Sequence, residues 1–274
     1  MELPLGEVAG YPGLHVVRIS PDQQLDLATE CLVTHINPPN ATNILKGKVY
    51  SCRPPSALPG DSLWEIESAH LQDLQLQEPP LPTSIPTSLR LSQLRWVTLG
   101  YQYDWTLRSY PDQVVPEADN PTPFPAALAA QFRKLVSACG YDAGVFRPEA
   151  GIVNFYPHNA VMGAHTDEVE KTHKAPVVSV SLGPPCVFLV GGLTKDDDPL
   201  ALLLRTGDVV VIGGPSRLRY HAVPRVFTEL GLPAELEVLR HAPPAEEPKG
   251  DNTHKTLNFL ATTRININVR QVFD

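Results

Sequence analysis

Two histidines and one aspartate have the residue types and the spacing of a metal site. His165 and Asp167 stand two residues apart, and His221 follows 56 residues after His165. On a strand or at its end, residues two apart point to the same face. Two imidazoles and one carboxylate form the facial triad of non-haem Fe(II) oxygenases, which leaves coordination positions open. The alternatives are a zinc hydrolase that uses the same three residues and a solvated surface pair of His165 and Asp167.

A second pattern stands near the end of the chain, where residues 264–270 (RININVR) alternate polar and apolar without a break. On a strand, Arg264, Asn266, Asn268 and Arg270 share one face. If the aliphatic face packs on helices, the polar face points inward, where guanidiniums are very costly unless anions meet them. At ~3.3 Å per residue the two arginines are about 20 Å apart, too far to bind one carboxylate. Beside a metal triad, this pattern favours a dicarboxylate co-substrate. An edge strand with a solvated polar face is the alternative.

Short apolar runs, with turn residues between them, must position these side chains. They predict strands at residues 151–156, 177–182, 187–190, 200–204, 208–212 and 264–273. Short strands in regular succession indicate a β-sandwich or barrel. The acidic stretch 228–256 interrupts the series, and we expect a long insertion there with a flexible centre.

Helices are predicted before and between these strands. Residues 20–23 (SPDQ) form a helix start, with serine as the cap, proline in the first turn and glutamine three residues on, so we expect a helix that ends near His35. Two more helices are predicted over 61–77 and 125–139. Residues 96–103 are aromatic and β-branched, which favours a strand or hairpin.

The composition excludes several classes of protein. With 29 prolines in 274 residues, the chain cannot be a helical bundle or a coiled coil. A net charge of −8 argues against a broad nucleic-acid-coating surface. The four cysteines form no CxxC motif, which favours reduced thiols over a disulfide framework or a zinc ribbon. No apolar run reaches the ~18 residues of a membrane span. The first residues resemble neither a secretion nor a transit signal, so we expect an intracellular protein of the nucleus or cytoplasm.

The stretch from about Leu94 to Phe273, two thirds of the chain, resembles the AlkB-type Fe(II)/2-oxoglutarate dioxygenases. The resemblance rests on pieces that occur in the same order: NFY at 154–156, HTD at 165–167, PVVSVSLG at 176–183, FLVGG at 188–192, GDVVVIGG at 207–214, SRL at 216–218, His221 and RININVRQ at 264–271. The runs LRWVTLGYQYDW at 94–105 and YPG at 11–13 are most similar to the eukaryotic AlkB-homologue-one branch.

The resemblance implies an α+β fold, a double-stranded β-helix (jelly roll) with flanking helices. On this basis we expect residues 91–274 to form an AlkB-like dioxygenase domain. We expect residues 1–90 to form a helical, proline-rich extension packed on that domain, and the protein to be a monomer.

The resemblance also assigns roles at the site. His165, Asp167 and His221 would be the catalytic residues that hold Fe(II), with 2-oxoglutarate and O₂ as the other reactants. Arg264 would pair with the distal carboxylate of 2-oxoglutarate, and Arg270 would brace the near end or Asp167. Further hydrogen bonds to the co-substrate would come from Asn154, Tyr156 and Asn266.

The reaction implied is oxidative demethylation of N-methylated nucleobases in DNA or RNA, with release of formaldehyde, succinate and CO₂. The target base must leave its stack or arrive single-stranded, and the acidic net charge favours single-stranded or locally opened substrates. Tyr101, Gln102 and Tyr103 match the Gly-Tyr-x-Tyr segment of the family, and Lys195 matches a basic contact position, which implies that all four bind substrate. Strand packing of the tyrosines and a solvated loop lysine are the alternatives.

One departure from the family leaves the choice of base open. Val169 stands where the bacterial relatives carry an acidic residue that reads the base. With the acidic net charge, this leaves room for a protein-directed oxygenase, a hydroxylase or demethylase, on the same scaffold. A binding module without catalysis is a third class, and the complete triad and both arginines argue against it.

Overall fold

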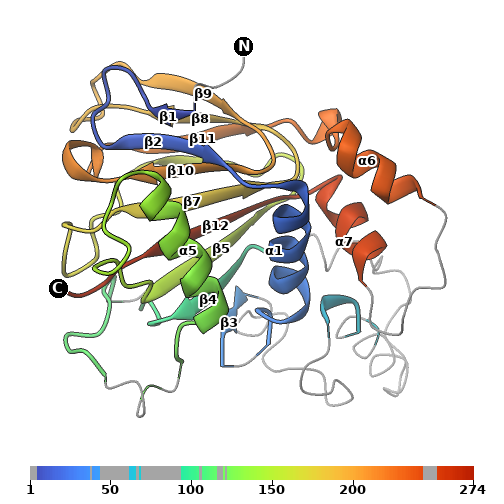
Figure 1. Cartoon of the computed structure of the whole chain (residues 1–274), viewed down its shortest axis with the longest axis horizontal. Helices are drawn as coiled ribbons and strands as arrows, with labels where there is room; N and C mark the ends of the chain where they lie inside the picture. Colours follow the sequence, from blue (N-terminus) through green and yellow to red (C-terminus); the bar gives the residue numbers. More distant parts are fainter. Residues whose placement is uncertain are drawn as a thin grey trace, which may run out of the picture.

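The computed structural model describes residues 5–37, 39–43, 62–65, 68, 94–104, 107–115, 120, 122–242 and 252–274. Two antiparallel sheets dominate it, with helices outside them (Figure 1). The larger sheet has eight strands, in the spatial order β1 (Gly6–Glu7), β2 (Leu14–Arg18), β10 (Asp208–Ile212), β7 (Val177–Leu182), β12 (Arg264–Arg270), β5 (Ala150–Tyr156), β4 (Trp96–Gly100) and β3 (Ala41–Thr42).

The smaller sheet packs on the inner face of the larger one. Its four strands, in spatial order, are β6 (Met162–His165), β11 (His221–Val226), β8 (Cys186–Val190) and β9 (Leu200–Leu204). A core cluster joins the sheets, because Leu14 and Val210 of the larger sheet pack with Phe188 and Leu202 of the smaller one. Two facing antiparallel sheets confirm the predicted jelly roll.

Helices cover the other face of the larger sheet (Figure 1). They are α1 (Pro21–Val33), α5 (Ala126–Ala138), α6 (Ala234–His241) and α7 (Thr253–Leu260). Leu32 of α1, Phe132 of α5 and Leu257 of α7 are fully buried in one cluster with side chains of β4, β5, β7, β10 and β12. This second core holds the outer face of the larger sheet rigid.

Strand β12 lies near the centre of the larger sheet, between β7 and β5. Ile265, Ile267 and Val269 are fully buried against the helices. Because side chains alternate along a strand, the polar residues at 264, 266, 268 and 270 point to the opposite side, toward the smaller sheet. The prediction of an inward polar face is confirmed, and the edge-strand alternative is wrong.

The predicted start of the first helix is confirmed by the local hydrogen bonds. Ser20 caps α1, because its hydroxyl accepts from the Gln23 amide at 3.3 Å and its own amide donates to the Gln23 side chain at 3.0 Å. Helix α5 ends before Gly140, which adopts a φ of 80°.

In the described part of the first 90 residues, three short strands accompany helix α1. Strand β2 pairs with β10 over five residues, and β1 and β3 also join the larger sheet, so this part of the chain belongs to the sheet as well as packing on it. Strand β2 (LHVVR) is only partly buried, and it mixes polar and apolar residues. For this reason its sequence pattern did not predict a strand. Of the predicted helix over 61–77, the structure describes only residues 62–65 and 68.

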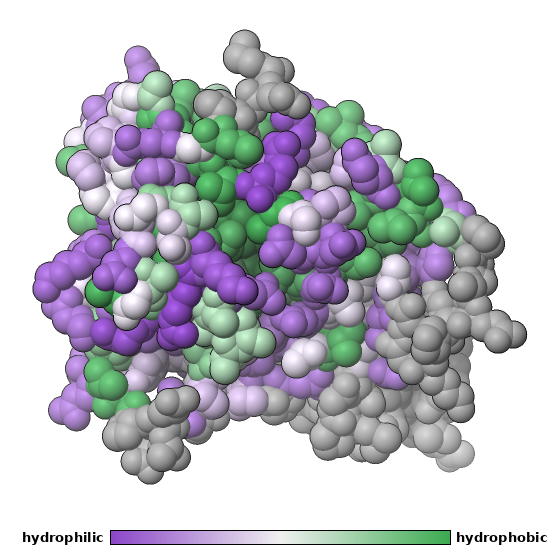
Figure 2. All heavy atoms as spheres, in the orientation of Figure 1, coloured by the Kyte–Doolittle hydropathy of each residue, from purple (hydrophilic) through white to green (hydrophobic). Residues whose placement is uncertain are grey.

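The stretch 228–256, which was expected as a long insertion with a flexible centre, contains helix α6 and the first turn of α7, and most of its centre lies outside the described residues. Helices α6 and α7 contact each other, and Leu236, Leu257 and Leu260 are buried. Figure 2 shows hydrophilic residues interspersed with apolar ones on the helical face. Within the described residues, none of the helices combines the length and the apolar character that a bilayer span requires.

Candidate metal and co-substrate site

The three predicted metal ligands come together at one end of the smaller sheet. His165 ends β6 and His221 begins β11, and the two residues are paired across these strands. Their ring centroids are 4.3 Å apart. Asp167 follows β6 by two residues, and its Oδ2 lies 3.8 Å from Nε2 of His221. Ligand atoms of all three lie within 4.8 Å of one another, so they can share one ion.

Both imidazoles are oriented by backbone carbonyls. Nδ1 of His165 donates to the carbonyl oxygen of Gly163 at 2.8 Å, and Nδ1 of His221 donates to that of Arg219 at 3.3 Å. Because a carbonyl oxygen can only accept, each Nδ1 carries the proton and each Nε2 keeps its lone pair. Burial lowers the pKa of His221 below its usual value, against the attraction of Asp167. A neutral imidazole with a free Nε2 is the form that binds a metal.

Asp167 is kept ionised in a buried place. Its Oδ1 accepts from Nη1 of Arg270 at 3.4 Å, and its Oδ2 accepts from Nδ2 of Asn268 at 3.2 Å. Burial by itself would raise the pKa of Asp167, but the guanidiniums of Arg270 and Arg217 hold this pKa well below its usual range. The carboxylate therefore has the charge that a divalent cation needs.

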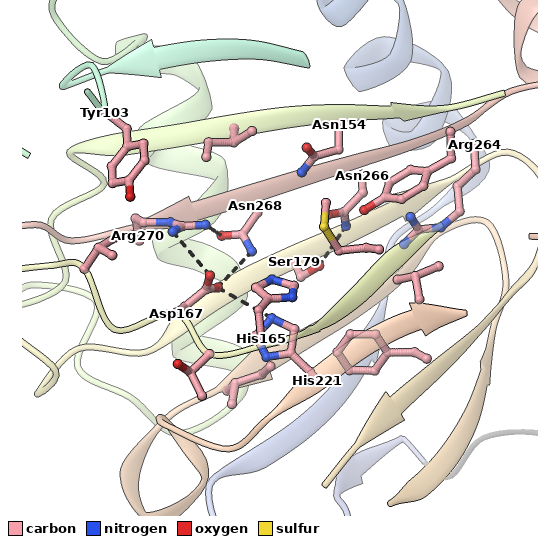
Figure 3. A pocket seen from close by; sticks show the side chains of 18 of the residues that line it. Tyr103, Asn154, His165, Asp167, Ser179, His221, Arg264, Asn266, Asn268 and Arg270 are labelled. Atoms are coloured by element: carbon pink, nitrogen blue, oxygen red, sulfur yellow. Dashed lines mark hydrogen bonds and ion pairs between the residues drawn. The ribbon is translucent and has the colours of Figure 1, made fainter. Parts of the chain in front are cut away.

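The polar face of β12 and the triad line one cavity of about 270 Å³ between the sheets (Figure 3). At one end of the strand, Arg270 and Asn268 point toward Asp167. At the other end, Arg264 lies apart from this group, near Tyr156. The two arginines therefore serve different ends of the cavity, as their separation along the strand predicted.

Arg264 has spare hydrogen-bond donors. The residue is only 1 % exposed, Nη2 donates to Ser181 at 3.1 Å, and Cζ stacks 4.9 Å from the centre of the Tyr156 ring. Within the described part of the chain, Nε and Nη1 of Arg264 have no hydrogen-bond partner, and neither has Nε of Arg270. Each unpaired buried donor costs roughly 1–3 kcal/mol. Nη1 and the second proton of Nη2 form one edge of this guanidinium, where a carboxylate can accept from both, so the residues present fit a small diacid.

Three other predicted co-substrate residues also line the cavity. Asn154 on β5 is paired with Asn266 on β12. Nδ2 of Asn266 donates to Ser179 at 2.7 Å and to the carbonyl oxygen of Val180 at 3.0 Å, which fixes the amide. Tyr156 is buried beside Arg264, and burial raises its pKa, so it stays a protonated donor.

The four predicted substrate residues do not stay together. Tyr103 lines the cavity, whereas Tyr101, Gln102 and Lys195 are not among its lining residues. Strand β4 ends at Gly100, whose φ of 69° turns the chain, so the alternation of a strand does not continue through 101–103. Of these four residues, only Tyr103 lies at the cavity, and contact of the other three with substrate stays a prediction.

Each of the three has another partner. The hydroxyl of Tyr101 donates to the carbonyl oxygen of Val115 at 3.1 Å, and its ring packs on Phe273. The Gln102 amide donates to the Gly100 carbonyl oxygen at 2.9 Å. Lys195 lies 5.6 Å from the centre of the Tyr220 ring, on an exposed loop.

Four further residues complete the site, and no sequence pattern had indicated a role for them. Asn268 contacts Asp167, although only its place on the polar face was evident. Tyr110 lines the cavity and packs edge to face on Tyr103, with ring centroids 5.4 Å apart. Burial raises the pKa of Tyr110 to about 12. Glu170 and Arg217 form a buried ion pair behind Asp167. Only tertiary contacts identify the roles of these residues. For Tyr110 and Glu170 the reason is that both lie on loops, where the sequence has no periodicity.

The triad predicts which histidines control metal affinity. His221→Ala should abolish binding of Mn(II), a redox-stable probe for Fe(II), because two ligands cannot hold the ion facially. His158 is the matched control: it lies near the motif in sequence, but its Nδ1 contacts Thr228 at 2.9 Å. Isothermal calorimetry should therefore find unchanged affinity in His158→Ala. Tight Mn(II) binding by His221→Ala would contradict the triad.

Comparison with known proteins agrees with this geometry. Residues 65–270 match the model of the 2OG-Fe(II) oxygenase superfamily, whose members use Fe(II), 2-oxoglutarate and O₂. The solved structure "The structure of OsALKBH1" matches with a TM-score of 0.54 at 21 % identity, covering 98 % of this chain and all of that one. At this identity the match supports the fold alone.

Two relatives are similar to this chain over nearly its whole length. The human "Nucleic acid dioxygenase ALKBH1" is 34 % identical over 96 % of this chain, and the chain spans 65 % of that protein's length. The "DNA N(6)-methyladenine demethylase ALKBH1A" of Arabidopsis thaliana is 33 % identical over 98 % of this chain and is covered over 78 % of its length. The chain therefore belongs to the 2OG-Fe(II) oxygenase superfamily and, within it, to the ALKBH1 group.

Proposed function

We propose that this protein is an Fe(II)- and 2-oxoglutarate-dependent dioxygenase that removes N-methyl groups from nucleobases in DNA or RNA. The observation that carries the proposal is the pairing, in one cavity, of the triad with a buried arginine that has two unpaired donors. A zinc hydrolase would use the triad but would have no use for that arginine. The names of the human and Arabidopsis relatives support the nucleic-acid substrate.

The described side chains divide the work along the cavity. His165, Asp167 and His221 would hold the ion, and Arg264 would bind the distal carboxylate of 2-oxoglutarate. When bound, Fe(II) and 2-oxoglutarate supply the activation of O₂ that oxidises a methyl group. The protein contributes a fixed orientation of these groups in a cavity between two packed sheets.

The substrate end of the cavity suits an unpaired base. Tyr103 and Tyr110 form an aromatic wall there, and base–aromatic stacking is worth about 1–3 kcal/mol per base. Val169 lies on the same side and adds no charge. A base can reach this cavity only outside its helical stack. We therefore propose single-stranded or locally opened DNA or RNA as the substrate, and a monomer that acts in the nucleus or the cytoplasm.

A formaldehyde-release panel tests the proposed function. Purified protein with Fe(II), 2-oxoglutarate and ascorbate is mixed with N-methylated DNA or RNA oligomers, single- and double-stranded, with methylated histone peptides as the protein-substrate arm. We expect formaldehyde and succinate in equal amounts from single-stranded oligomers. Formaldehyde from the peptides alone would refute nucleic-acid demethylation and favour a protein-directed oxygenase.

The Arg264 assignment predicts a selective loss of co-substrate affinity. Arg264→Lys keeps the charge but loses the planar fork, so the 2-oxoglutarate dissociation constant of the Mn(II)-loaded protein should rise about 10- to 100-fold. Arg225→Lys is the control, because Arg225 is exposed and pairs with Glu229 at 3.0 Å. Calorimetry that finds the same affinity in Arg264→Lys and wild type would contradict the assignment.

The aromatic wall predicts a separate loss at the substrate end. Tyr103→Ala should lower formaldehyde release from a methylated oligomer about tenfold or more, while succinate formation without the oligomer stays unchanged. Tyr101→Phe, at a tyrosine outside the cavity, should change neither rate by more than about twofold. If Tyr103→Ala lowers both rates equally, its role is structural.

A further inference from the structure

Glu170 is a carboxylate with no exposed side-chain surface, held between two guanidiniums. Its Oε1 accepts from Nη1 of Arg270 at 2.8 Å, and its Oε2 accepts from Nη2 of Arg217 at 3.0 Å. The exposed fraction of the Glu170 side chain is 0 %, and the two arginine side chains are 3 % and 6 % exposed. Burying a charge is costly unless it is paired, so this arrangement must be specified by the fold.

Four buried charges form one network around Asp167. Two guanidiniums, Arg217 and Arg270, face two carboxylates, Glu170 and Asp167. Arg217 also donates to the backbone carbonyl oxygens of Ala175 and Asp167, but Glu170 is its only ion-pair partner among the described residues. The charges therefore balance only if Glu170 is present.

Arg270 lies closer to Glu170 than to Asp167. Its Nη1 is 2.8 Å from Glu170 and 3.4 Å from Asp167, while Nη2 donates to Asn268 at 2.7 Å. Burial opposes the charge of Arg270, yet Asp167, Tyr110 and Glu170 together raise its pKa above its usual value. Because Arg270 stays charged, its guanidinium competes with a metal ion for the lone pairs of the Asp167 carboxylate oxygens.

We propose that Glu170 is a positioning residue that holds Arg270 away from Asp167, so that the Asp167 carboxylate stays available to the metal. Without the Glu170 charge, Arg270 would shift toward Asp167 and form a closer pair. The metal would then have to displace that pair before it binds. The inference rests on the proposed metal site but does not depend on which base, or which macromolecule, is the substrate.

A double-mutant cycle, with Mn(II) affinity measured by calorimetry, tests whether Glu170 acts through Arg270. Glu170→Gln keeps the shape and removes the charge, and Mn(II) affinity should fall about 10-fold or more, as for other residues that orient metal ligands. In an Arg270→Met background no guanidinium can capture Asp167. There, adding Glu170→Gln should change Mn(II) affinity less than about threefold. Glu168→Gln, at an exposed neighbour, is the matched control and should match wild type.

The cycle separates positioning from a structural role. If Glu170 only supports the fold, for example through Arg217, then Glu170→Gln will weaken Mn(II) binding equally in both backgrounds, and the proposal is overturned. Unchanged affinity in the single variant overturns it as well. Should Glu170→Gln fail to fold by circular dichroism, Glu170→Asp replaces it in the cycle, because its shorter side chain keeps the charge but cannot span both guanidiniums.

Mn(II) affinity does not require turnover of a methylated base. A protein that demethylates no oligomer but shows this coupling would refute the proposed substrate and leave the inference standing. A protein that demethylates oligomers but shows no coupling between Glu170 and Arg270 would support the proposed substrate and overturn the inference.

Discussion

The structure depends on one constraint: a central strand, buried on both faces, carries two guanidiniums into the space between the sheets. The aliphatic face of β12 makes its burial favourable. The arginines of the other face must then be paired, because buried unpaired charges are costly. Arg270 is paired within the protein by Asp167 and Glu170, whereas Arg264 keeps two unpaired donors. The cavity is thus neutralised at its metal end and leaves a positive charge at its other end.

The remaining elements position partners for that strand. The pairing of His165 with His221 brings two ligands together from strands far apart in the sequence. The segment after β6 then supplies both Asp167 and Glu170, which accept from the same Nη1 of Arg270. One short segment therefore provides a metal ligand and the residue that we infer keeps it available. The helices contribute to function indirectly, by fixing the larger sheet from outside.

Regular elements were predictable because their signals are local. Strands such as 177–182 and 208–212, the capped helix at Ser20 and the two faces of 264–270 follow from periodicity and capping alone. The triad could be predicted because metal ligands have few residue types. Contacts made by loop residues could not be predicted from the sequence. Tyr101 and Tyr103 are two residues apart, yet the turn at Gly100 sends only one of them to the cavity. Glu170 resembles a surface residue in sequence, and only the fold brings two arginines to it.

The most direct test of the proposed site is a crystal structure of the protein determined from crystals grown without oxygen in the presence of Mn(II) and 2-oxoglutarate. We expect one ion bound by His165, Asp167 and His221, and the distal carboxylate of 2-oxoglutarate on the guanidinium of Arg264, with Nη1 among its donors. A diacid that binds elsewhere, with neither carboxylate in contact with Arg264, would contradict this assignment.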